Sequence, residues 1–150
     1  MQAVIFIGIQ GTGKTTFFKE RFFDTHLRIS LDLLKTRNRE RIFLEACLQS
    51  GQKFVVDNTN PTIEERKRYI VPAKAANFEV VGYYFDSNIS EALQRNRKRA
   101  QKERIPDKGI LRTFHKLQIP SFNEGFDKLY RVKIDDQGLF KVEEWSDEVR

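Results

Sequence analysis

A glycine-rich loop near the start of the chain carries residue types that bind phosphate. Residues 8–15 read GIQGTGKT and match the pattern G-x-x-x-x-G-K-[ST]. Glycines let backbone N–H groups turn toward an anion, and a helix that begins after the loop adds its positive end. In this pattern Lys14 reaches the β- and γ-phosphates of a nucleoside triphosphate, and the Thr15 hydroxyl holds magnesium. The predicted nucleotide-binding residues of the loop are Gly8, Gln10, Gly11, Thr12, Gly13, Lys14, Thr15 and Thr16.

The surroundings of this loop strengthen the prediction. Ordinary residue frequencies produce such a match by chance in roughly one chain of this length in 200. Here the apolar run AVIFI precedes the loop and a helical segment at about 14–23 follows it. Because the loop does not identify the phosphate acceptor, the search moves to carboxylates at the ends of other strands, where ligands of open α/β sheets bind.

Two aspartates occupy such strand ends. Asp57 follows the apolar run 54–56 and has the form of a carboxylate that holds Mg²⁺ or its waters; the alternative is a strand-end turn or helix cap. Asp32 follows the short strand expected at 27–30. It could accept the proton of an attacking hydroxyl, and the alternative is the N-cap of the next helix.

Basic residues gather in three segments. Arg95 and Arg99 lie four apart on one helix and share a face, which predicts a lid over the phosphates at about 95–110; a solvated helix face is the alternative. A second group predicts the acceptor side of the site or an ordinary surface helix: Lys35, Arg37, Arg39 and Arg41. We interpret the third group, residues 66–68, as a mixed-charge helix face, and most of the 13 phenylalanines as core.

Strand-like and helix-like segments alternate along the chain and predict the fold. Strands are expected at residues 2–7, 27–30, 54–56, 80–85 and 130–134, the last continuing into a hairpin that ends at 143. Helices are expected at residues 14–23, 38–49, 62–76, 90–101 and 110–117, with Ser90 as an N-cap. Such alternation predicts an α/β fold with a mainly parallel central sheet covered on both faces, in a single domain of residues 1–150.

Composition favours a soluble protein. Hydrophobic residues make up 39% of the chain, and no apolar run approaches the roughly 20 residues that cross a bilayer. A single cysteine, Cys47, excludes an internal disulfide and suits the cytoplasm; we expect it in the core. The two histidines stand apart from any metal-ligand cluster, so no zinc site is expected. A net charge of +6 favours polyanionic partners.

Several segments together resemble one family. GIQGTGKTTF, the aspartate of RISLDLLK, VVDNTNPT, and RNRKR followed by IP are similar to the kinase domain of 5′-hydroxyl polynucleotide kinases. The wider group is the small P-loop kinases of the zeta-toxin-like, AAA_33 type. The resemblance extends from Ala3 to about Arg131. It implies a three-layer P-loop NTPase fold with an adenylate-kinase-like strand order 2-3-1-4-5 and a helical lid.

The resemblance also implies roles for individual residues. Lys14 and Thr15 would bind ATP and Mg²⁺, with Asp57 beside the loop as a second metal ligand. Asp32 would be the general base that activates the 5′-OH, and Arg99 would lie on the phosphates. The family usually has an arginine where this chain has Lys35, reaching the neighbouring phosphate of the acceptor. Lysine offers a point charge in place of a bidentate fork.

Three functions therefore stand as hypotheses. The leading one is ATP-dependent transfer of the γ-phosphate to the 5′-OH of RNA or DNA, with Lys14, Asp32 and Arg99 as catalytic residues. Arg95 would join the nucleotide site, and Asp32, Lys35 and Arg37 would bind the acceptor. The alternatives are a kinase for a small hydroxyl acceptor and a nucleotide-dependent regulatory ATPase. No membrane partner is expected.

Overall fold

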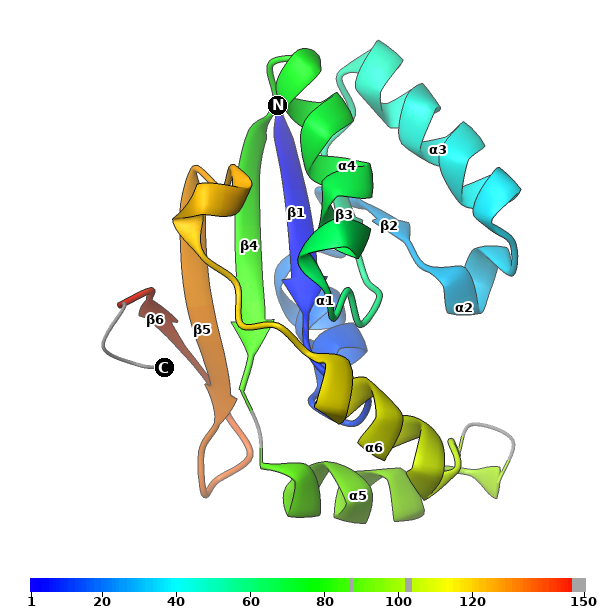
Figure 1. Ribbon diagram of the computed structural model, residues 1–150, viewed down its shortest axis with the longest axis vertical. Helices are drawn as coiled ribbons and strands as arrows, with labels where there is room; N and C mark the ends of the chain where they lie inside the picture. Colours follow the sequence, from blue (N-terminus) through cyan, green and yellow to red (C-terminus); the bar gives the residue numbers. More distant parts are fainter. Residues whose placement is uncertain (87, 102–103, 147–150) are drawn as a thin grey trace.

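The computed structural model describes residues 1–86, 88–101 and 104–146 of the chain. Its described strands form one six-stranded sheet in the order β2-β3-β1-β4-β5-β6 (Figure 1). Neighbours are parallel except β5 and β6, which are antiparallel. The strands are β1 (Gln2–Ile7), β2 (Leu27–Ile29), β3 (Phe54–Val56), β4 (Glu79–Phe85), β5 (Lys128–Ile134) and β6 (Phe140–Glu144). The predicted order 2-3-1-4-5 is confirmed, and the terminal hairpin adds β6 at the edge.

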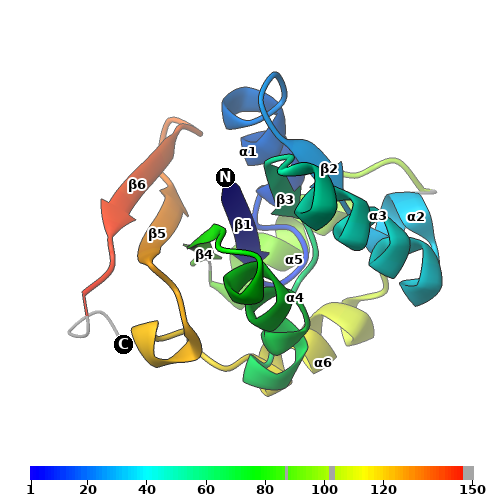
Figure 2. The ribbon, with the colours of Figure 1, turned by 90° about the horizontal axis from the view of Figure 1, so that it is seen from above.

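Helices cover both faces of this sheet. Figure 2 shows α1 on one face and α4 on the other, which makes the three layers that the sequence predicts. The described helices are α1 (Lys14–Arg21), α2 (Leu31–Leu34), α3 (Arg37–Ser50), α4 (Ile63–Ala75), α5 (Ile89–Arg97) and α6 (Asp107–Lys116), with a short 3₁₀ turn, η2 (Phe122–Glu124). None of the described helices is long and apolar enough to cross a membrane.

The apolar run AVIFI forms the centre of both cores. Side chains of a strand alternate between the two faces of a sheet. Ile5 and Ile7 therefore pack in the core under α3 and α4, whereas Val4 and Phe6 pack in the core with α1. Both faces of β1 are buried from Ala3 to Ile7, so this part of the strand is apolar rather than alternating. Cys47 is buried in the first of these cores, as expected.

Some element boundaries differ from the predictions. Helix α5 starts one residue before Ser90, because Asn88 is its N-cap and accepts a hydrogen bond from the N–H of Glu91 at 2.7 Å. It ends at Arg97, four residues before the predicted end. Helix α6 begins at Asp107, three residues before its predicted start and within the segment predicted to be a lid. Residues 102–103 of that segment lie outside the described residues.

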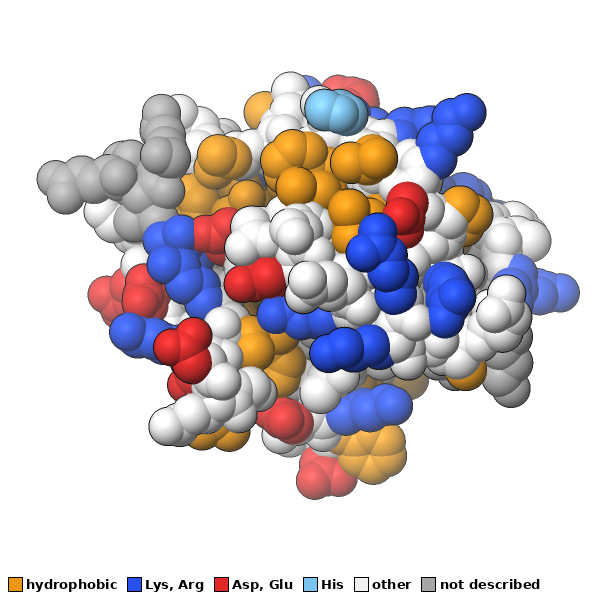
Figure 3. Space-filling view, turned by 90° about the horizontal axis from the view of Figure 1, so that it is seen from below, with side chains coloured by type: hydrophobic (Ala, Val, Ile, Leu, Met, Phe, Trp, Pro, Cys, Tyr) orange, Lys and Arg blue, Asp and Glu red, His pale blue; other side chains and the backbone are white. Residues whose placement is uncertain are grey.

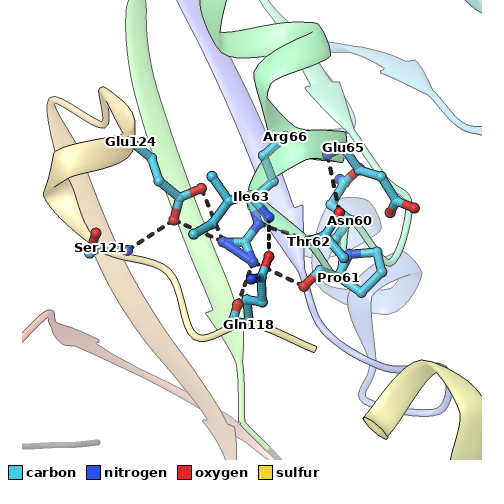
Figure 4. A network of polar contacts seen from close by, with 9 residues as sticks. All are labelled: Asn60, Pro61, Thr62, Ile63, Glu65, Arg66, Gln118, Ser121 and Glu124. Carbon is cyan, nitrogen blue, oxygen red and sulfur yellow. Dashed lines mark hydrogen bonds and ion pairs between the residues drawn. The ribbon is translucent and has the colours of Figure 1, made fainter. Parts of the chain in front are cut away.

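One prediction about side chains is wrong, and a second one has an exception. Arg66 is fully buried rather than on a mixed-charge face, since its guanidinium is paired with Glu124 at 2.8 Å and bonds to the carbonyl oxygens of Asn60 and Gln118 (Figure 4). Most phenylalanines are buried, as predicted, but Phe23 is an exception with 70% exposure. Helix α1 ends at Arg21, so the helical spacing that buries Phe17 and its neighbours no longer directs Phe23 inward.

Candidate active site

The loop between β1 and α1 has the backbone that its glycines allow. Gly11 and Gly13 have φ of +81° and +90°, a region that other residues rarely adopt. A Cβ on Gly11 would lie 2.7 Å from the carbonyl oxygen of Ala92 in α5. The N–H of Gly8 donates to the carbonyl oxygen of Thr59 at 3.0 Å. The loop is therefore fixed between α5 and the segment that follows β3.

Lys14 is the buried cation of this loop. Its amine donates to the carbonyl oxygens of Gly8 and Ile9 at 2.9 and 2.7 Å. The pKa of Lys14 is lowered to about 8, chiefly by burial; the charges of Asp57 and Asp32 act to raise it and that of Arg99 acts to lower it. The charges that affect Lys14 thus include all three residues predicted to surround a transferring phosphate.

Asp57 and Thr15 lie together at the end of β3. The Asp57 side chain is almost fully buried, and its Oδ2 accepts from the Thr15 hydroxyl at 2.9 Å. A hydroxyl and a carboxylate are the hard oxygen ligands that Mg²⁺ takes together with phosphate oxygens, so these two residues fit the ion. The same Oδ2 accepts from Arg28 Nε at 2.8 Å. The sequence analysis missed Arg28; a basic residue inside a strand that leads to Asp32 was the available signal.

Asp32 is positioned by the segment after β3. It lies in the first turn of α2, whose N-cap is Ser30, with the Ser30 hydroxyl accepting from the Asp32 N–H at 3.2 Å. The alternative that Asp32 itself caps a helix is therefore wrong. The Leu31 N–H donates to Asn58 Oδ1 at 2.9 Å, and Asn58 Nδ2 donates to buried Glu40 at 3.0 Å. Asn58, which was not predicted, joins α2 to α3 beside Asp57.

Helices α5 and α6 lie across the loop end of the sheet. Ile9 of the loop packs with Ala92 of α5 and Ile110 of α6. Buried Asn96 bonds to both the N–H and the carbonyl oxygen of Ile105, which closes the connection between the two helices at its base. This connection carries Arg99 to the site. Asn96 is the asparagine of the RNRKR segment, and these hydrogen bonds give it a structural role that the sequence analysis did not predict.

Two adjoining cavities meet at Asp32. The first lies over the loop, with Gln10, Gly11, Gly13, Lys14, Thr15, Thr16, Asp57, Asn58, Thr59, Arg99 and Ile105 joining Asp32 in its lining. The second, of ≈ 570 Å³, shares Thr15, Asp32, Arg99 and Ile105 with the first. Among the described residues it is lined by one carboxylate, Asp32, and five cations: Lys19, Arg28, Lys35, Arg99 and Arg104. Figure 3 views this end of the molecule, where basic side chains gather around the middle.

The remaining predicted residues are placed as follows. Gly8 and Thr12 lie within the loop, where the Thr12 hydroxyl donates to the Ile9 carbonyl oxygen at 2.9 Å. Arg95 donates to the Gly11 carbonyl oxygen at 3.2 Å. Arg37 lies elsewhere: it lines a cavity between α3 and α4 and bonds to Glu40 and to the hydroxyl of Tyr69, at 2.9 and 3.0 Å. Of the residues predicted to bind the acceptor, Lys35 thus lines the second cavity together with Asp32, whereas Arg37 lies outside it.

The fold and the loop together define a P-loop kinase. The chain belongs to the AAA_33 family, described as an AAA domain, whose model matches residues 29–118. That match begins after the loop, so the loop geometry is additional to it. The chain is 28% identical over 138 residues to the bifunctional polynucleotide phosphatase/kinase of Schizosaccharomyces pombe, covering 87% of this chain and 33% of that protein. The chain thus spans about a third of the length of this curated relative.

Solved structures show the same fold at low identity. A gluconokinase from Sinorhizobium meliloti has a TM-score of 0.63 at 15% identity, covering 90% of this chain and 83% of that one. Kti12 from Chaetomium thermophilum, in complex with ADP-AlF3, has a TM-score of 0.62 at 16% identity, covering 91% and 92% of the two chains. Since both likenesses are below 25% identity, they show the fold and leave the acceptor open.

Proposed function

We propose that this protein transfers the γ-phosphate of ATP to the 5′-OH of RNA or DNA. The observation that carries the proposal is the second cavity, in which Asp32 stands alone among five cations of the described residues. A basic wall suits an acceptor that carries phosphodiesters, because each phosphate contact pairs with a Lys or Arg side chain. The name of the fission yeast relative supports the same acceptor.

In the proposed reaction Asp32 takes the proton of the 5′-OH. The oxygen of that hydroxyl bonds to the γ-phosphorus, and the bond from this phosphorus to the β–γ bridging oxygen breaks, which leaves ADP. Lys14 and Arg99 would stabilise charge on the transferred group, and this role is supported by their place beside Asp32 in the lining of the first cavity. Thr15 and Asp57 would hold Mg²⁺, which neutralises phosphate charge when bound.

Lys35 is proposed to bind the phosphate next to the reacting hydroxyl. It is exposed, lines the second cavity and has φ of 74°, a left-handed conformation that costs a non-glycine residue about 1–3 kcal/mol. Replacement by glycine keeps this backbone while it removes the amine. Lys35→Gly should raise the KM of an oligonucleotide acceptor and leave the KM of ATP unchanged. An equal effect on both substrates would contradict the assignment.

The test of the proposed function offers γ-labelled ATP and Mg²⁺ with several acceptors. These are a 5′-OH oligoribonucleotide, the matching oligodeoxynucleotide, a free nucleoside, gluconate and no acceptor. Label is expected on the 5′ end of an oligonucleotide, with steep loss of acceptor affinity as salt increases. Asp32→Asn should lower kcat about 10²–10⁴-fold, as expected for loss of a general base. The exposed Asp136→Asn, in the hairpin turn, is the control.

The outcomes separate the candidate activities. Label on gluconate or the nucleoside alone would make the protein a small-acceptor kinase and overturn the nucleic-acid proposal. Label released only as free phosphate, at a rate that Asp32→Asn does not change, would indicate a regulatory ATPase. Label on an oligonucleotide with unchanged kcat in Asp32→Asn would keep the acceptor and remove the assigned base.

A further inference from the structure

A third hollow continues the basic cavity along the outside of α1. It measures ≈ 340 Å³ and lies within the roughly 300–1,000 Å³ range of small-ligand sites. It shares Thr15, Lys19 and Arg28 with the acceptor-side cavity, and the rest of its lining is Phe18, Phe23, His26 and Leu27. The two hollows therefore form one surface, cationic near Asp32 and apolar farther from it.

Phe23 is the most prominent apolar side chain of this surface. At 70% exposure it is the most exposed of the large hydrophobic residues among those described. It follows the end of α1, while its neighbour Phe22 packs in the core against Phe6 and Phe17. The backbone of Phe23 is therefore anchored by its buried neighbour, while its own ring lies outside the core. Leu27, 43% exposed, lines the same hollow.

The lining supplies stacking surface and cations rather than a pocket for a charged group. His26 is held by hydrogen bonds to Thr25 Oγ1 and Gln2 Oε1 at 2.7 and 2.8 Å, and its ring packs edge-on against Phe22. Exposed Lys19 lies at the junction with the acceptor-side cavity. Alternation of an aromatic face with cations is the arrangement by which proteins hold single-stranded nucleic acid.

We propose that Phe23 stacks on a base of the acceptor strand downstream of its 5′ end, with Lys19 bound to the intervening phosphate. This inference rests on the proposed function, because the strand enters from the cavity that holds Asp32. It adds a specificity: a single strand long enough to reach Phe23 binds more tightly than a nucleoside 3′-phosphate, which fills only the part near Asp32 and Lys35. A base within a duplex has its faces covered by neighbours and cannot stack there.

The test compares two acceptors in three variants. Steady-state kinetics are measured with a nucleoside 3′-phosphate and with a single-stranded 5′-OH octamer. Phe23→Ala should raise the KM of the octamer at least about fivefold, the lower end for loss of one base–aromatic stack, while kcat changes little. The KM of the nucleoside 3′-phosphate should not change. Phe23→Trp should restore tight binding of the octamer, because the larger ring keeps the stacking face.

Phe122→Ala provides the matched control. Phe122 is also an exposed phenylalanine, at 48%, but it lies in η2 and lines a separate cavity beside β5. It should leave both KM values unchanged. Phe23→Trp also supplies a readout apart from activity, since the chain has a single tryptophan: the added indole should be quenched when the octamer binds without ATP.

The outcomes distinguish this inference from the proposed function. Wild-type protein that labels the octamer, together with a Phe23→Ala variant within twofold of wild type on the octamer, would overturn the stacking site and leave the kinase assignment intact. Equal loss in Phe23→Ala and Phe122→Ala would also overturn it. Wild-type protein that labels no nucleic acid would overturn both.

Discussion

Arg66 offers a test of how the buried polar network holds the fold. Its side chain is fully buried in α4, and Glu124, its partner in η2, is 4% exposed. The guanidinium also donates to the carbonyl oxygens of Asn60 and Pro61 at 3.0 and 3.1 Å and to that of Gln118 (Figure 4). Arg66→Met fills similar space with apolar atoms and leaves the carboxylate without its cation.

The expected loss of stability in Arg66→Met follows from the buried ion pair that it breaks. Removal of one member of a buried ion pair costs about 3–5 kcal/mol, because the remaining charge is uncompensated. For a chain of this size the midpoint of thermal unfolding, Tm, should fall by about 10 °C. Urea denaturation measures the free energy of unfolding directly, with the slope m unchanged if unfolding stays two-state. Arg68→Met, on the same helix and exposed, should change the free energy by less than about 0.5 kcal/mol.

A double variant separates the charge from the carbonyl contacts. Arg66→Met with Glu124→Met removes both charges, so stability should be partly recovered relative to Arg66→Met alone. About 1–3 kcal/mol of the loss should remain, since the carbonyls of Asn60 and Gln118 still lack their donor. Full recovery would show that the carbonyl contacts contribute nothing. A fall in the free energy of unfolding of less than about 1 kcal/mol in Arg66→Met would refute the reasoning. It would mean that water reaches the remaining carboxylate of Glu124.

Three further predictions concern the nucleotide site. The pKa of Lys14 is lowered to about 8, and phosphate binding needs the charged form of this amine. Nucleotide binding above pH 8 should therefore take up a proton and weaken by up to about tenfold per pH unit. Calorimetry in two buffers tests this, and a flat affinity from pH 7 to 9 would contradict it. Gly11→Ala should abolish nucleotide binding, whereas Gly138→Ala, with φ of +80° but open space around it, should bind normally. Asn96→Ala should raise the KM of ATP and lower kcat by releasing Ile105; wild-type kinetics would show that Arg99 is placed without this clamp.

Sequence patterns predict best those parts of the molecule that depend on local chemistry. The loop at residues 8–15 and the strand ends before Asp32 and Asp57 each follow from a few neighbouring residues. The sheet follows from alternation of segments together with the family resemblance. All of these lie where expected, and the first cavity brings Lys14, Asp32, Asp57 and Arg99 together.

The unpredicted parts depend on residues far apart in the chain. Arg66 pairs with a residue 58 positions away, and no local pattern distinguishes it from the exposed Lys67 beside it. The exposure of Phe23 depends on where α1 ends, and the end of a helix depends more on tertiary contacts than on the neighbouring residues. Arg28 was overlooked because its partner, Asp57, follows the neighbouring strand β3 and lies 29 positions later in the chain. Tertiary partners, rather than propensity, decide all three.

The segment DNTN after β3 joins the parts of the site that sequence distance separates. Asn58 bonds to α2, which carries Asp32, and to Glu40 of α3. Thr59 accepts the N–H of Gly8 in the phosphate loop, and Asn60, with φ of 44°, donates to the carbonyl oxygen of Phe6 at 2.7 Å. The two amides thus join one short loop to α2 and α3 and to β1. This short segment therefore holds the phosphate loop in one frame with Asp32 and Asp57, the residues proposed as acceptor base and metal ligand.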